Sequence, residues 1–282
     1  MSKGTARPPS QAGAFYTADP EELRHEVEGY ITAAPARETP RPPLGFVAPH
    51  AGYRFSGSTA GHVYGQLRAL RPEVVVILAA SHRARFPHPS IWDGEGYRTP
   101  LGVCPTDVAL VDGLHQSMPG IECQRHADAA EHSLEVQVPF LQVACPDARM
   151  VPILMGATDR SDAEALAEAI LQAVGGAETA QRGRVAFLAS SDGYHGYRLA
   201  ECKTSDARLA KALEAMDVKS TYGLTASGDP MACGRGPIAV VIDVCRNLGA
   251  TQGTILNQST SADFIAHSDG QWVVGYTAAM FS

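Results

Sequence analysis

Short apolar runs rich in β-branched residues alternate along this chain with segments of helical periodicity. The runs with the length and composition of buried strands are Leu44–Pro49, Val74–Ala80, Val151–Met155, Val185–Ser190 and Trp272–Met280. The helical patterns that lie before and between them are Pro20–Ala33, Gly57–Leu70, Asp162–Val174, Arg198–Met216 and Pro237–Leu248. This alternation predicts an α/β fold with a central, mostly parallel or mixed β-sheet flanked by helices.

The length of the chain is compatible with one α/β domain that buries a sizeable core, since it has 282 residues. The Pro-rich stretch 35–43 (PARETPRPP) reads as a connector, because too little chain precedes it to form a domain of its own. We therefore expect a single domain over residues 1–282, with residues 1–10 as a flexible N-terminal tail.

The charge balance argues against nucleic acid as a partner. The chain has 23 Lys and Arg residues against 30 Asp and Glu, a net charge of −7, whereas nucleic-acid binding requires a basic face. No segment approaches the roughly 18 apolar residues of a membrane span. Residues 1–18 lack the apolar centre of a signal peptide. We expect a cytoplasmic protein without a membrane partner.

Histidines follow two of the predicted strands, at the strand ends where ligands bind in open α/β sheets. His50 comes directly after the Leu44 strand, and His82 comes directly after the Val74 strand. We expect the two to converge from neighbouring strand ends. Imidazole nitrogen suits iron, zinc, copper and nickel, and Cys233, Asp192 and His195 are all available as a third ligand.

Cys233 stands in a Gly-rich turn, Cys233-Gly234-Arg235-Gly236-Pro237, just before a predicted helix. Glycine lets the backbone approach a bound ion closely, and a helix N-terminus stabilises a thiolate. These features suit metal ligation and a nucleophile equally. The cysteines of this chain form no C-x-x-C pair, which argues against a zinc ribbon and a thioredoxin motif.

The segment Glu131-His132-Ser133-Leu134-Glu135 has the pattern of a helix that continues to Leu141. It predicts Glu131 and Glu135 on one solvated face, with His132 pointing inward and Pro139 bending or ending the helix. Tyr16 and Tyr53 are candidates to close over a site, although aromatic residues near strand ends are usually core.

The motifs of this chain, taken in order, resemble those of the Memo family, whose bacterial members are called AmmeMemoRadiSam system protein B. The resemblance extends from about residue 10 to the C-terminus and rests on these segments: Gly13-Ala14-Phe15-Tyr16, Ala48-Pro49-His50-Ala51-Gly52-Tyr53, Ser81-His82, Tyr97-Arg98-Thr99-Pro100-Leu101-Gly102, Glu131-His132-Ser133-Leu134-Glu135-Val136-Gln137, Ser190-Ser191-Asp192 with His195, and Cys233-Gly234-Arg235.

The resemblance implies a fold like that of class III extradiol dioxygenases and a site in the matching cleft. It implies a metal set of His50, His82 and Cys233, with Asp192 and His195 alongside. Those dioxygenases hold iron(II) with two histidines and a carboxylate, so Cys233 replaces a carboxylate with a softer thiolate. After Asp192 the chain has Gly193 where relatives usually have a bulkier residue, which suggests extra room for a substrate.

Our leading hypothesis is a metal-dependent oxidoreductase, a non-haem Fe(II) dioxygenase-like enzyme that acts with O₂ on a small phenolic or catecholic substrate. His195 would be the general base, Asp192 would orient it, and His132 would hydrogen-bond substrate or oxygen. The residues expected to contact substrate are Tyr16, Tyr53, Tyr194 and Arg235.

Two alternatives remain open at this point. The first is a non-catalytic metal-binding, redox or peptide-recognition protein of the Memo type, in which copper or zinc replaces iron. The second is a hydrolase in which Cys233 is the nucleophile. The bacterial family name suggests a radical-SAM partner system, and a homo-oligomer is also compatible with the sequence.

Overall fold

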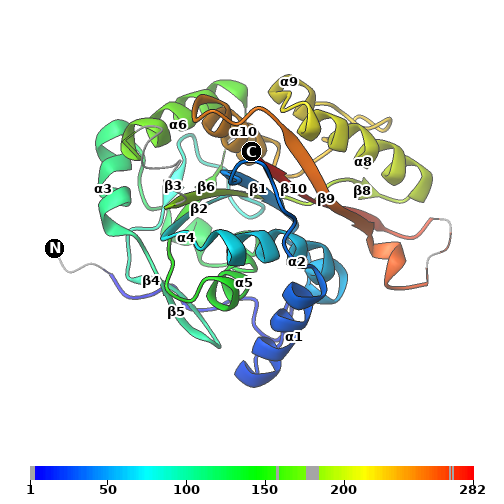
Figure 1. Ribbon diagram of the computed structural model, residues 1–282, viewed down its shortest axis with the longest axis horizontal. Coiled ribbons are helices and arrows are strands. Elements are labelled where there is room, and N and C mark those ends of the chain that lie inside the picture. The colour runs from blue at the N-terminus through cyan, green and yellow to red at the C-terminus, as the bar shows by residue number, and fades with distance from the viewer. Residues whose placement is uncertain (1–3, 157–158, 176–183, 267, 269) are drawn as a thin grey trace.

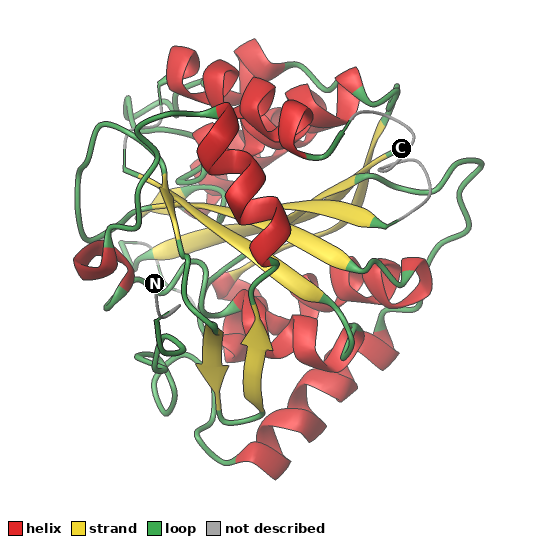
Figure 2. Cartoon of the chain, turned by 90° about the vertical axis from the view of Figure 1, so that its left-hand side faces the viewer, coloured by secondary structure: helices red, strands yellow, loops and turns green. Residues whose placement is uncertain are grey.

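The computed structural model describes residues 4–156, 159–175, 184–266, 268 and 270–282, which fold as one α/β domain with helices on both faces of a central sheet (Figures 1 and 2). The strands of this sheet are β1 (Gly45–Ala48), β2 (Val74–Ala80), β3 (Ser90–Ile91), β6 (Arg149–Met155), β7 (Val185–Ser190), β8 (His195–Gly196), β9 (Gly253–Thr260) and β10 (Val273–Phe281). A separate hairpin consists of β4 (Gly96–Thr99) and β5 (Gly102–Pro105).

The helices are α1 (Pro20–Ala33), α2 (Tyr53–Leu70), α3 (Val108–Ser117), α4 (Arg125–Asp128), α5 (Gln137–Ala144), α6 (Arg160–Ala173), α8 (Leu199–Glu214), α9 (Val218–Thr221) and α10 (Arg235–Asn247), with a 3₁₀ turn η1 (Ser261–Asp263). None of the helices in the described part of the chain is long and apolar enough to cross a membrane.

The sheet is mixed and mostly parallel at its centre, as predicted. Its strand order is β3-β6-β2-β7-β1-β10-β8, and β9 pairs with β10. The central strands β6, β2, β7 and β1 are parallel, whereas β3, β8, β9 and β10 pair antiparallel with their neighbours. The carboxyl ends of β1, β7 and β2 therefore meet at one edge of the sheet.

The alternation of side chains along the central strands divides the interior into two cores. In β2, Val74, Val76 and Leu78 pack in one core, which includes buried residues of α3, α6, α8 and α10. Val75 and Ile77 pack in the other core with α1, α2 and α5. Both faces of β2 are buried, which explains its uninterrupted apolar sequence.

The helix boundaries follow local signals where such signals exist. Helix α1 begins as predicted, because the Asp19 carboxylate accepts the backbone N–H groups of Glu21 and Glu22 and Pro20 takes the first helical position. Helix α2 begins at Tyr53 rather than at Gly57. A side chain at Gly57 would collide with the Tyr30 ring of α1, so the glycine permits close helix packing.

The predicted flexible tail over residues 1–10 is wrong where the structure describes it. Arg7 is only 1% exposed, and its guanidinium lies 2.6 Å from the Glu135 carboxylate, which is completely buried. The same guanidinium donates hydrogen bonds to the backbone carbonyls of Asp128 and Glu131 at 2.6 and 2.8 Å. Residues 1–3 lie outside the described part of the chain.

The segment 131–136 is not the helix that its sequence pattern predicts. It runs as an irregular turn, and α5 begins only at Gln137, which places Pro139 in the first turn, where its missing N–H costs nothing. Glu131 and Glu135 are 1% and 0% exposed, so the predicted solvated acidic face is also wrong. The contacts with Arg7 hold this backbone away from helical geometry.

We predict that Arg7→Met destabilises the fold by about 3–5 kcal/mol, because it leaves the buried Glu135 carboxylate without its cation. Urea denaturation measures this loss. The matched control is Arg184→Met, whose ion pair with Glu73 is about half exposed on both sides and whose loss should cost under about 1 kcal/mol. Equal losses in the two variants would contradict a structural role for Arg7, whereas Glu135→Gln added to Arg7→Met should recover part of the stability.

Candidate metal centre

The candidate site lies where β1, β7 and β2 end. His50 follows β1, His82 follows β2, and Ser190 is the last residue of β7. The two histidines do converge, although not from neighbouring strands, because β7 lies between β1 and β2 in the sheet. A parallel arrangement brings all three ends to one place, as expected for a ligand site in an α/β fold.

His50, His82 and His132 form one group that could hold a metal ion. Each offers a ring nitrogen, and these nitrogens lie within 4.8 Å of one another. The ring centroid of His50 is 5.1 Å from that of His82 and 5.2 Å from that of His132. His50 is buried at 2% exposure, whereas the side chain of His82 is 30% exposed. The group is therefore anchored in the interior and open on one side.

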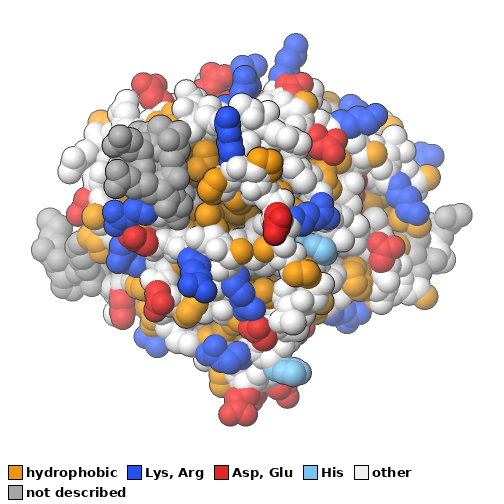
Figure 3. All heavy atoms as spheres, in the orientation of Figure 1, with side chains coloured by type: hydrophobic (Ala, Val, Ile, Leu, Met, Phe, Trp, Pro, Cys, Tyr) orange, Lys and Arg blue, Asp and Glu red, His pale blue; other side chains and the backbone are white. Residues whose placement is uncertain are grey.

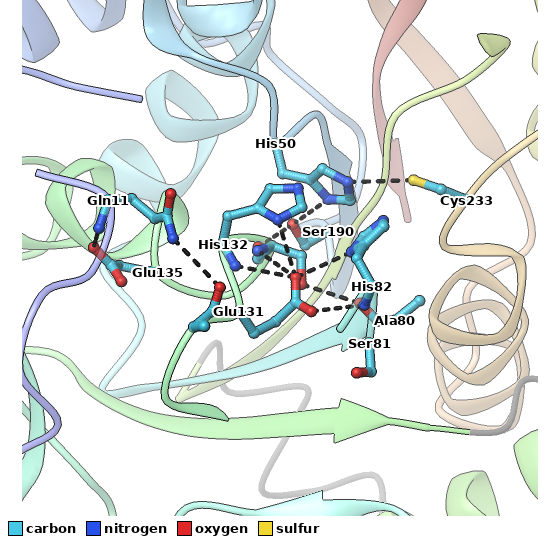
Figure 4. Close-up of polar contacts among 12 residues, drawn as sticks. Gln11, His50, Ala80, Ser81, His82, Glu131, His132, Glu135, Ser190 and Cys233 are labelled. Atoms are coloured by element: carbon cyan, nitrogen blue, oxygen red, sulfur yellow. Dashed lines mark hydrogen bonds and ion pairs between the residues drawn. The ribbon is translucent and has the colours of Figure 1, made fainter. Parts of the chain in front are cut away.

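The buried Glu131 carboxylate orients the His82 ring and lies close to His132 (Figure 4). Its Oε1 lies 3.0 Å from His82 Nδ1, and its Oε2 accepts the His82 backbone N–H at 2.6 Å. Because a carboxylate only accepts, His82 Nδ1 carries a hydrogen, so Nε2 is the nitrogen that would bind a metal once its own proton is displaced. His132 Nδ1 lies 3.2 Å from Glu131 Oε1, but without the alignment of a hydrogen bond.

A chain of hydrogen bonds sets the tautomer of His50 in the same way. The Ser190 hydroxyl has one hydrogen, which it donates to the Ser133 carbonyl at 2.6 Å. Ser190 Oγ can therefore only accept from His50 Nδ1, which lies 3.1 Å away. Gln137 Nε2 donates to the same oxygen at 2.8 Å and fills its second lone pair. The Nε2 atom of His50 is thus unprotonated in the neutral ring, and its lone pair is available to a ligand.

The protonation of the group follows from its surroundings. Burial, with further contributions from His82 and His132, holds the pKa of His50 well below its usual value, so this imidazole is neutral. Burial also acts to lower the pKa of His82, but hydrogen bonds to Cys233 and Glu131 outweigh it and raise the pKa to about 10. Burial acts to raise the pKa of Glu131, but the close ring nitrogens of His132 and His82 hold it far below its usual value.

Cys233 lies directly beside the histidine group. Its Sγ is 3.3 Å from His50 Nε2 and accepts the backbone N–H of Asp192, also at 3.3 Å. The adjoining Gly234 is in close contact with the end of β7, since a Cβ there would lie 2.6 Å from the Ser191 Cβ. Cys145, in contrast, is a core thiol whose pKa burial raises to about 12.

His195 and Asp192 form a second layer next to the group. His195 Nδ1 lies 3.1 Å from the Gly193 carbonyl, which can only accept, so its Nε2 is unprotonated when the ring is neutral. That Nε2 lies 3.9 Å from Asp192 Oδ2. Asp192 Oδ1 accepts the backbone N–H of His50 at 2.7 Å. Burial raises the pKa of Asp192, against the opposing effect of His195.

Gly193 does not open space for a substrate. A Cβ at this position would lie 2.5 Å from Asp206 Oδ1, so the glycine accommodates the buried Asp206 carboxyl of α8. Tyr194 is 2% exposed, and it donates its backbone N–H to Asp206 and its hydroxyl to Glu201. The structure gives Tyr194 a packing role rather than a place on an open surface.

Tyr16 and Tyr53 are likewise engaged inside the protein. Their side chains are 4% and 3% exposed, and their hydroxyls donate to the Glu135 carboxylate at 2.7 Å and to the Val136 carbonyl at 2.6 Å. Both hydroxyls bind the 131–136 segment from the interior of the protein, so neither is free for a substrate. Arg235 is different, because it lines an open cleft together with Cys233.

This cleft has a volume of about 650 Å³ and adjoins the histidine group through Cys233 and Ser81. Its wall consists of Ala80, Ser81, Arg85, Phe86, Pro87, Gly156, Asp159, Cys233 and Arg235. Neither Arg85 nor the orienting roles of Glu131 and Ser190 follow from the sequence motifs, because those roles depend on contacts between distant segments. The one available signal was the position of Glu131 directly before His132.

Comparison with known proteins identifies relatives over nearly the whole chain. The family model described as Memo-like protein matches residues 7–280. A MEMO1 family protein of Methanopyrus kandleri is 34% identical over 284 residues, covering 98% of both chains. Those of Methanothermobacter thermautotrophicus and Archaeoglobus fulgidus are 33% and 35% identical, covering 96% and 98% of this chain and 98% and 99% of theirs.

Among solved structures, the crystal structure of an uncharacterized protein from Escherichia coli K12 aligns with a TM-score of 0.46 and 14% identity. The alignment covers 83% of this chain and 99% of that one. A likeness of this degree says nothing about function.

We predict that Glu131→Gln weakens metal binding by about ten- to a hundredfold, because the amide no longer fixes the ring orientation of His82. Competition with a chelator measures the affinity. Glu122→Gln, an exposed residue of the same type, is the control and should bind metal like the wild type. Unchanged affinity in Glu131→Gln would remove the orienting role.

Asp206 gives a prediction about stability and pH. Burial raises the pKa of Asp206 to about 6, above the ordinary value of 3.8, so the folded state binds this proton more tightly than the unfolded state. The resulting contribution to folding stability is full below pH 4 and is lost as the pH rises through 6. Asp206→Asn should therefore gain on the order of 2–3 kcal/mol relative to wild type between pH 4 and pH 7.

Urea denaturation across that pH range checks the trend. Asp217→Asn is the control, because Ser220 hydrogen bonds lower the pKa of Asp217, so its effect on stability changes below pH 4 and its difference from wild type should stay nearly constant over this range. A pH-independent difference for Asp206→Asn would contradict the assignment.

Proposed function

Because the chain belongs to the Memo-like protein family, we propose that it is a metal-dependent oxidoreductase that holds a transition metal at His50, His82 and Cys233. His132 would be a further donor, since its ring nitrogen lies in the same group. The observation that carries this proposal is the orientation of His50 and His82, whose Nδ1 atoms are held by Ser190 and Glu131, so that Nε2 of each ring is the position available to a metal.

The donor set fits a first-row transition metal. Imidazole nitrogens and one thiolate suit iron, zinc and copper, whereas magnesium and calcium require oxygen ligands. The nearby carboxylates, Glu131 and Asp192, accept hydrogen bonds from His82 and from the His50 backbone, so they support the ligands from behind. We propose iron(II) as the metal, with copper or zinc as the competing ions.

The reaction proposed is a dioxygenase-like oxidation of a small phenolic or catecholic substrate. Iron(II), when bound, would supply oxygen activation and Lewis acidity toward a substrate hydroxyl. His195 would accept the hydroxyl proton at Nε2, which is free because Nδ1 donates to the Gly193 carbonyl. Asp192, 3.9 Å away, would stabilise the resulting imidazolium.

A specific contact favours a second candidate, in which Cys233 is a nucleophile. The 3.3 Å separation of Cys233 Sγ and His50 Nε2 is that of a thiol–imidazole pair, and Ser190 orients the imidazole from its other side. This arrangement would support acyl transfer without a metal.

Metal analysis of the anaerobically purified protein tests the proposal. We expect near-stoichiometric iron in the wild type, and its loss in Cys233→Ala and His82→Ala. Cys123→Ala is the control, because this free thiol is also half-buried and lies outside the group, so it should keep its metal. His195→Ala should keep its metal but lose substrate-dependent O₂ uptake with catechols.

The other outcomes identify the alternatives. Bound zinc or copper without O₂ uptake would favour a non-catalytic metal-binding protein. Stoichiometric iodoacetamide labelling of Cys233 that added metal does not prevent would favour the nucleophile. Absence of metal after reconstitution with iron(II) would overturn the ligand assignment.

A further inference from the structure

The cleft beside the histidine group has an unusual charge for this protein. Two arginines, Arg85 and Arg235, line it together with one carboxylate, that of Asp159. The chain as a whole carries a net charge of −7, and on the face seen in Figure 3 basic and acidic side chains are interspersed. The cleft is therefore a local excess of positive charge on an acidic protein.

The two guanidinium groups have no acceptor among the residues that the structure describes. Over residues 4–156, 159–175, 184–266, 268 and 270–282, neither forms a hydrogen bond or an ion pair with another side chain or carbonyl. Within the described part of the chain, Arg235 contacts the Tyr222 ring, with its Cζ 5.6 Å from the ring centroid, and this contact uses none of its N–H donors. Arg7, by comparison, directs its guanidinium at five different acceptor residues.

The acid in the cleft wall does not neutralise the arginines. Asp159 is the N-cap of α6, and its Oδ1 accepts the Asp162 backbone N–H and the Ser161 hydroxyl, both at 2.9 Å. These hydrogen bonds lower the pKa of Asp159 and hold its charge at the helix end. The carboxylate is thus committed to α6, and the cation excess of the cleft remains.

The position of Arg235 adds to this excess. It is the first residue of α10, where the helix dipole is positive and a cation is unfavourable, and the first turn of α10 contains no acidic residue. An anion in the cleft would interact favourably with both the guanidinium and the helix end. Planar guanidinium groups bind carboxylate and phosphate through paired N–H donors.

We propose that Arg85 and Arg235 bind the oxyanion, a carboxylate or a phosphate, of a small organic ligand whose other end reaches Cys233. The volume of about 650 Å³ accommodates a ligand of one or two rings. The inference rests on the proposed function only for what the far end of the ligand meets, since the oxyanion contact requires no metal.

Calorimetric titration of the metal-free, full-length protein at low salt tests the proposal, with benzoate, phenyl phosphate and the neutral benzamide as probes. We expect one of the two anions to bind at least about tenfold more tightly than benzamide. The tighter of benzoate and phenyl phosphate then identifies the oxyanion. Omitting metal prevents an anion from binding through the metal itself.

Matched arginine variants locate the contact. Arg85→Gln and Arg235→Gln should each raise the dissociation constant of the preferred anion by about tenfold. Arg83→Gln is the control, because Arg83 is exposed, lies two residues from Arg85 and does not line the cleft, so its change should stay within about twofold.

Three results would overturn the proposal: equal binding of benzamide and the anions, unchanged binding in Arg85→Gln and Arg235→Gln, or an equal loss in Arg83→Gln. Iron(II) uptake, measured on separate aliquots of each preparation after reconstitution, separates this inference from the proposed function. Anion binding that depends on both arginines in a protein that cannot take up metal supports the inference alone. Full metal occupancy without anion binding overturns the inference alone.

Discussion

The buried ion pair between Arg7 and Glu135 fixes the segment on which the candidate site is built. Arg7 also binds the carbonyls of Asp128 and Glu131, so one guanidinium holds both ends of a turn more than 120 residues away in sequence. That turn carries Glu131, whose carboxylate orients His82. The Glu135 carboxylate is 0% exposed, and a buried charge is costly unless it is paired, so this turn requires Arg7. The N-terminal segment that carries Arg7 is therefore needed to hold the histidines facing one another.

The central fold follows from local sequence because its strands are buried on both faces. β2 and β7 have the predicted boundaries, and α1 begins at Pro20 because Asp19 caps it. Strand β9 was not predicted, since its sequence GTILNQST has little apolar alternation and its pairing with β10 supplies the order. The helix predicted over residues 131–136 is wrong for a similar reason, because tertiary contacts with Arg7 override the helical pattern of the sequence.

The histidine part of the candidate site is predictable to the extent that strand ends reveal it. His50 and His82 follow apolar strands, and parallel pairing necessarily brings strand ends together. The partners that set their tautomers could not be predicted, since Ser190 and Glu131 act through contacts across 140 and 49 residues. The motifs that contain Tyr16 and Tyr53 predict a ligand contact, whereas both side chains are buried and their hydroxyls bind the 131–136 segment.

The carboxylates of this site have a different role from the one they have in a metal site whose ligands are two histidines and a carboxylate. Glu131 and Asp192 both accept hydrogen bonds from groups that carry the histidines, so neither is free to become a ligand without releasing them. In the proposed site the negative charge at the metal must then come from Cys233, which is 3.3 Å from His50 Nε2. A thiolate donates more electron density than a carboxylate, and three imidazoles beside it add no charge. The carboxylates thus position the histidines, while in the proposed site the single thiol would determine the electronic character of the metal.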